Sequence, residues 1–121
     1  MSTPRCPVVA VVCAAPLAAE ALSAAFDGVA DVLPLPAGRP DLAGLLESLR
    51  PAGVVVDERH DAEAATGYSR RSGAPLLHVQ LRDSTLTVWE DHGWRTSGKA
   101  VSPEHVRNVV LAAIAASRPL P

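Results

Sequence analysis

The chain has 121 residues, of which 48% are hydrophobic, and its formal net charge at pH 7 is −2. This length predicts one domain, residues 1–121, with enough apolar side chains for a single core. The charge is nearly balanced and no basic cluster exceeds Arg70-Arg71, which argues against nucleic acid as a partner. No run reaches the ~20 apolar residues of a membrane span, so we expect a cytoplasmic protein without membrane contact.

The first third of the chain alternates between strand and helix patterns. Residues 7–13 form a continuous apolar run, which is typical of a strand buried on both faces. Pro16 favours the start of a helix, which we expect to end near Phe26. Residues 31–36 alternate apolar residues with prolines. Because proline cannot donate to a central ladder, this segment predicts an edge strand.

The middle of the chain continues the same alternation. Asp41 is the expected N-cap of a second helix, since the leucines within residues 42–49 fall on one helical face. Residues 54–56 predict a third buried strand that ends at an acidic residue. Residues 61–72 predict a weaker helix, and residues 76–81 a fourth strand.

The pattern changes after the fourth strand. Two half-exposed strands flank a turn at residues 91–93, which predicts a β-hairpin over about 84–98. A two-residue loop is expected to place Glu90 opposite Arg95 as a favourable cross-strand pair. A hairpin therefore stands where a fourth helix would be expected.

A strong helix start follows the hairpin, with Ser102 as N-cap, Pro103 at the first position and Glu104 in the first turn. The order of elements predicts an α/β fold. We expect a three-layer α/β/α sandwich with a flavodoxin-like parallel sheet of strand order 2-1-3-4-5. The hairpin takes the place of the fourth helix in this arrangement.

Two local sequences resemble the receiver domain of two-component response regulators. Residues 51–57 are similar to the receiver's third strand, which ends in the phospho-accepting aspartate. Residues 99–104 are similar to its Lys-Pro-Phe-Ser-Pro-Glu motif, which leads into the last helix. The resemblance implies that Asp57 is phospho-acceptor-like and that Lys99 is switch-lysine-like. We expect these two side chains to form a salt bridge at the carboxyl edge of the sheet.

The chain departs from the receiver pattern at the metal site. In receivers an acidic pair after the first strand binds Mg²⁺, which neutralises the phosphoryl oxygens. Here Cys13, Ala14 and Ala15 occupy that place, and residues 80–82 at the hydroxyl position include neither serine nor threonine. The sequence therefore indicates a pseudo-receiver without metal or cofactor. We expect a non-enzymatic regulatory or interaction module that acts through protein contacts and is not phosphorylated in the usual Mg²⁺-dependent way.

Trp89 and Trp94 are the candidate interface residues, because tryptophan on a short hairpin is often an interface anchor. The alternative is that both rings cover the edge of the core. We expect at least one ring to be available to an unidentified protein partner or to a second copy of the chain, as in a homodimer.

Cys13 supports an alternative function. It closes the first strand and precedes a helix, and this arrangement is similar to the phosphocysteine loop of sugar phosphotransferase B components and to low-molecular-weight tyrosine phosphatases. A phosphate-handling enzyme or carrier is therefore the second hypothesis. The loop after Cys13 has no Gly, Ser, Thr or Arg, and Glu20 repels anions. A receiver that is still phosphorylated at Asp57 is the third hypothesis.

Two further features have ordinary interpretations. Acidic and imidazole side chains gather after the third strand, where a solvated loop is a commoner interpretation than a metal site. They are Asp57, Glu58, His60, Asp61 and Glu63. His78 alternates with apolar residues in a buried strand, so we expect a core or edge histidine rather than a catalyst.

Overall fold

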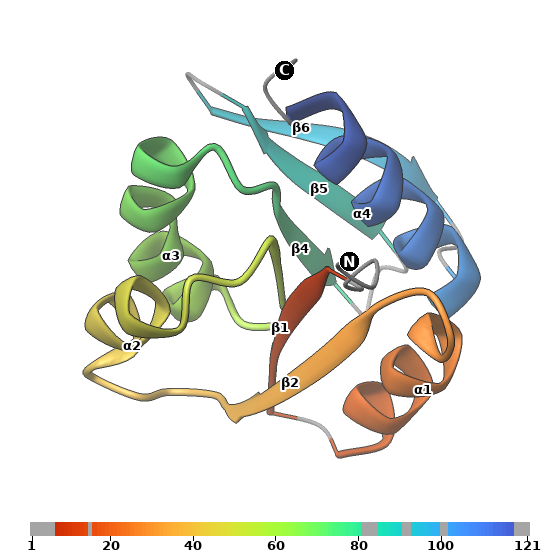
Figure 1. Cartoon of the computed structure of the whole chain (residues 1–121), viewed down its shortest axis with the longest axis horizontal. Helices are drawn as coiled ribbons and strands as arrows, with labels where there is room; N and C mark the ends of the chain where they lie inside the picture. The colour runs from red at the N-terminus through yellow and green to blue at the C-terminus, as the bar shows by residue number, and fades with distance from the viewer. Residues whose placement is uncertain (1–6, 15, 81–84, 91–92, 100–101, 118–121) are drawn as a thin grey trace, which may run out of the picture.

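The architecture is built on one sheet of six strands in the order β2-β1-β3-β4-β5-β6 (Figure 1). The structure, a computed structural model, describes residues 7–14, 16–80, 85–90, 93–99 and 102–117. The strands are β1 (Val8–Cys13), β2 (Asp31–Pro36), β3 (Gly53–Val56), β4 (Leu76–Gln80), β5 (Thr85–Glu90) and β6 (Gly93–Lys99). The first four strands run parallel, and β5 and β6 form an antiparallel hairpin beside β4.

Two pairs of helices cover the two faces of the sheet (Figure 1). The helices are α1 (Pro16–Phe26), α2 (Leu42–Leu49), α3 (Arg59–Ser72) and α4 (Pro103–Ser117). Side chains from α1 and α4 share one core cluster, and side chains from α2 and α3 share the other. This arrangement confirms the predicted α/β sandwich with a flavodoxin-like layout, in which the hairpin occupies the place of a fourth helix.

Strand β1 lies between β2 and β3 and has buried residues on both faces. Val9 and Val11 point into the α1/α4 cluster, whereas Ala10 and Val12 point into the α2/α3 cluster. The continuous apolar run predicted this double burial correctly. The proline-containing β2 lies at one end of the strand order, as expected for an edge strand.

Two predictions about helix starts need correction. Asp41 stands at the N-cap position of α2, but its side chain makes no capping hydrogen bond. It accepts hydrogen bonds from the Arg39 guanidinium instead, with an Nε–Oδ1 distance of 2.9 Å. Helix α3 begins at Arg59, two residues before the predicted start, because Glu58 takes the extended N-cap conformation.

The hairpin register also differs from the expectation. Glu90 pairs with Gly93, and Arg95 pairs with Val88, so the expected Glu90–Arg95 cross-strand pair is wrong. Gly93 is already the first residue of β6. Residues 91 and 92, which come between the two strands in the sequence, lie outside the described residues. This shift places Trp89 directly opposite Trp94.

Helix α3 packs on β3 and β4, while β5 and β6 extend the sheet beyond it (Figure 1). Trp94 on β6 remains 38% exposed. Replacing a fourth helix with two strands thus leaves an accessible aromatic ring at one end of the sheet. None of the helices in the described part of the chain has the length and apolar character required to cross a membrane.

Candidate functional site at the carboxyl edge of the sheet

Asp57 follows β3 directly, at the edge of the sheet where the parallel strands end. Its backbone N–H donates to the carbonyl of Val12 on the neighbouring β1, at 3.2 Å. Both carboxylate oxygens of Asp57 accept from the backbone N–H of Ala14, each at 3.0 Å. The Asp57 carboxylate is thus hydrogen-bonded to the segment that joins β1 to α1.

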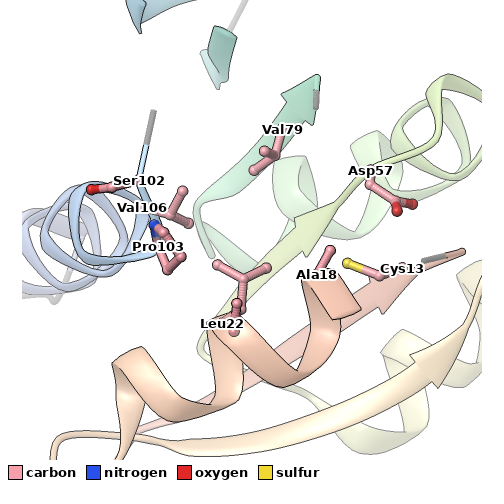
Figure 2. Close-up of a pocket in the computed structure, with 9 residues that line it drawn as sticks. Cys13, Ala18, Leu22, Asp57, Val79, Ser102, Pro103 and Val106 are labelled. Carbon is pink, nitrogen blue, oxygen red and sulfur yellow. The ribbon is translucent and has the colours of Figure 1, made fainter. Parts of the chain in front are cut away.

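A small cavity of about 90 Å³ lies beside Asp57 (Figure 2). Its lining is mostly apolar and comes from β1, α1, β4 and α4, with Cys13, Asp57 and Ser102 as its polar members. The remaining lining residues are Ala18, Ala21, Leu22, Val79, Pro103 and Val106. The Ser102 hydroxyl accepts from the backbone N–H of His105 at 3.1 Å, which confirms its predicted role as the N-cap of α4.

Cys13 occupies the last position of β1 and shares this cavity with Asp57 (Figure 2). Burial, and to a smaller extent the negative charge of Asp57, raise the pKa of the Cys13 thiol to about 12. The thiol therefore stays protonated near pH 7. A nucleophilic cysteine needs a depressed pKa, so this environment disfavours the second hypothesis.

The acidic residues after β3 have separate partners. Asp61 is 0% exposed, and its two carboxylate oxygens accept from the backbone N–H of Gly38 at 3.1 and 3.0 Å. Glu63 pairs with Arg59 at 3.5 Å on the exposed face of α3. Within the described residues, no three His, Cys, Asp or Glu side chains come together as a metal-binding group.

Lys99 is the last residue of β6, and its Cα pairs with that of Thr85 on β5. Two strands, β4 and β5, separate β6 from β3. At the usual strand spacing, the Lys99 backbone lies about 14 Å across the sheet from β3. The Lys99 side chain lies outside the described residues, so its salt bridge with Asp57 stays a prediction.

The two tryptophans form part of an aromatic cluster that the sequence did not predict. Their ring centroids lie 5.3 Å apart with an interplanar angle of 63°. Trp89 packs against the α2/α3 core cluster. The Trp94 ring also meets the ring of His78 edge-on, with a centroid distance of 6.0 Å. Strand periodicity could have indicated this cluster, had the hairpin register been assigned correctly.

A groove of about 230 Å³ runs along this aromatic cluster. It lies between the first turns of α3 and strands β4, β5 and β6. The lining residues are Arg59, Ala62, Glu63, His78, Gln80, Thr87 and Trp94. Gln80 ends β4 and belongs to the predicted hydroxyl position, while Leu81 and Arg82 lie outside the described residues.

Comparisons with protein-family models, with curated proteins and with solved structures found no match for this chain.

Proposed function

We propose that this chain is a non-enzymatic regulatory module, similar to a receiver domain, that acts through protein contacts and not through Mg²⁺-dependent phosphorylation. The observation that supports this proposal most strongly is the hydrogen bonding of the Asp57 carboxylate. Its two carboxylate oxygens accept from the Ala14 N–H, in the segment where receivers have their acidic metal ligands. Asp57 serves here as an anchor between β3 and the β1–α1 connection.

The chemistry of the surrounding cavity supports the same conclusion. Magnesium requires oxygen ligands in near-octahedral geometry and is usually bound by one or two carboxylates. Around Asp57 the cavity presents a protonated thiol and the apolar groups of Leu22 and Val79. Phosphoryl transfer depends on neutralising the charge of the transferred group, and the described residues of this lining supply no such charge.

The hairpin is the surface through which we expect the module to act. Trp94 exposes 38% of its surface, and its ring is held at a fixed angle by Trp89 and His78. An ordered, partly exposed indole loses little conformational entropy on binding, which suits an interface anchor. The partner is either a second copy of the chain or another protein.

A phosphorylation assay tests the proposal that the chain does not act through Mg²⁺-dependent phosphorylation. The protein is incubated with acetyl phosphate and Mg²⁺, and its intact mass is measured alongside a receiver that retains the acidic pair. We expect no gain of a phosphoryl group in this chain and a gain in the reference receiver. A phosphoryl adduct that disappears in Asp57→Asn contradicts the proposal and favours the third hypothesis.

Self-association through the hairpin has a separate test. Sedimentation analysis over a range of concentrations compares the native chain with Trp94→Ala. We expect a concentration-dependent mass that Trp94→Ala lowers. Leu17→Ala is the matched control, because Leu17 is 79% exposed on α1 and away from the hairpin. A monomeric mass at all concentrations contradicts self-association, and an equal effect of both variants contradicts the role of the hairpin.

A further inference from the structure

His78 connects the carboxyl edge of the sheet to the exposed tryptophan. It is the middle residue of β4 and is 7% exposed. Its side chain lies close to the backbone of Asp57, and its ring meets the Trp94 ring edge-on, with a centroid distance of 6.0 Å. The backbone carbonyl of His78 also accepts from the Thr87 hydroxyl at 3.3 Å. His78 therefore lies beside the connection after β3, meets β5 through its backbone carbonyl and meets β6 through its ring.

Charged groups approach His78 from two elements. Asp57 and Glu58 come from the connection after β3, and Arg59 and Glu63 line the same groove from α3. Thr87 and Trp94, which face it from the hairpin, carry no charge. Burial lowers the pKa of His78 more than its contacts with Asp57 and Glu58 raise it. The ring is therefore neutral near pH 7.

We propose that His78 is a proton-controlled latch for the hairpin: the neutral imidazole holds Trp94 against the sheet, and the protonated imidazole releases Trp94 toward solvent. The biological meaning of the latch rests on the proposed function, because Trp94 is the surface that would be presented or withdrawn. The latch itself is a property of the His78–Trp94 contact, and it can be tested separately.

The physical reason is the cost of charging a buried ring. An imidazolium in this position needs water or a counter-ion, and the surrounding structure must open to provide it. The wall formed by Ala62 is 1% exposed and belongs to the core. Trp94 is 38% exposed and lies on the terminal strand, so the Trp94 side opens at the lowest cost. Water entering there hydrates the charged ring and displaces the indole.

The free energy of unfolding should also depend on the protonation of His78. The pKa of His78 in the folded protein lies below its ordinary value of 6.5, so the unfolded chain takes up the proton first as the pH falls. The contribution of neutral His78 to stability is complete above pH 6.5 and is lost as the pH falls through the lowered pKa. A local opening of the hairpin should therefore precede acid unfolding.

Tryptophan fluorescence tests the latch directly. Emission is recorded between about pH 7.5 and about pH 5, with far-UV circular dichroism at each point and NMR titration of the histidine rings. We expect a red shift of several nanometres that follows the His78 titration while the circular dichroism stays constant. Quenching without a red shift means that the imidazolium stays on the indole and overturns the proposal. A His78 ring that does not titrate in the folded protein overturns it as well.

Substitutions identify the side chains that cause the red shift. Trp94→Phe should abolish the red shift, and Trp89→Phe should retain it. His78→Leu removes the proton and should also abolish the shift, whereas His60→Gln removes an exposed imidazole on α3 and should leave it intact. A shift that persists in His78→Leu contradicts the latch. If His78→Leu does not fold, the Trp94→Phe and His60→Gln results still decide the question. A phosphoryl adduct at Asp57 in the acetyl phosphate experiment would overturn the proposed function, whereas the fluorescence titration of the unmodified protein would still test the latch.

Discussion

Asp57 resembles the phospho-accepting aspartate of receivers in its position after β3. In this chain, however, its carboxylate accepts hydrogen bonds from the backbone N–H of Ala14. The sequence located Asp57 correctly at the end of β3, because a buried strand that stops at a carboxylate is a clear pattern. The bond from the Ala14 N–H was not predictable, since it depends on how the β1–α1 connection turns toward β3. Strand patterns determine where a strand ends but not how the following loop is directed.

Asp57→Ala tests the anchoring role. The substitution removes a charge-assisted hydrogen bond between β3 and the β1–α1 connection, so we expect the free energy of unfolding to fall by about 1 kcal/mol. The effect stays at the low end for such bonds because Ala14 is exposed and water can replace the carboxylate. Urea denaturation measures it. Asp27→Ala, at an exposed position after α1, should change the value by less than about 0.5 kcal/mol.

The alkylation rate of Cys13 provides a chemical test of the protonation state of its thiol. With a pKa of about 12, only about one thiol in ten thousand is ionised at about pH 8. In a Cys6→Ser background, iodoacetamide should alkylate the folded protein at least about 100-fold more slowly than the urea-unfolded chain. Equal rates in the two states would mean that Cys13 is accessible and ionised, and would return the phosphate-handling hypothesis to consideration.

The connection between β2 and α2 shows that local sequence patterns can predict a helix without predicting the contacts that hold its neighbouring loop. The leucine pattern predicted α2 well, and Asp41 was placed at its N-cap, but Asp41 pairs with Arg39. The carboxylate that holds this connection is Asp61, from the first turn of α3, which accepts from the Gly38 N–H. A bond between residues 23 positions apart depends on the packing of α3 beside the loop, so local sequence rules could not find it.

Asp61→Ala should weaken the contact between α3 and this connection. Because Asp61 is fully buried, we expect a loss of about 2 kcal/mol in the free energy of unfolding. Glu63→Ala is the matched control on the same helix, since it removes an exposed ion pair with Arg59 that contributes less than about 1 kcal/mol. Thermal and urea unfolding of the two variants compare the effects, and equal losses would contradict the anchoring role of Asp61.

For the whole molecule, the sequence was sufficient for the sheet order and for the hairpin. Alternating patterns separated the parallel strands from β5 and β6, and the prolines identified β2 as an edge strand. The register within the hairpin was wrong by two residues, since Glu90 pairs with Gly93 and not with Arg95, because Gly93 belongs to β6 and not to the turn. The tryptophan pair and its contact with His78 follow from that register, and were missed for this reason.

Magnesium titration followed by NMR tests the central claim most directly, because it observes the Ala14 amide that the Asp57 carboxylate holds. Mg²⁺ is added to the native protein while the amide signals of Ala14 and Asp57 are recorded, with Asp57→Asn as the reference for loss of the charge. We predict that both signals stay at their positions up to millimolar Mg²⁺. A saturable shift of the two amides that is absent in Asp57→Asn would show a metal site at Asp57 and would contradict the account.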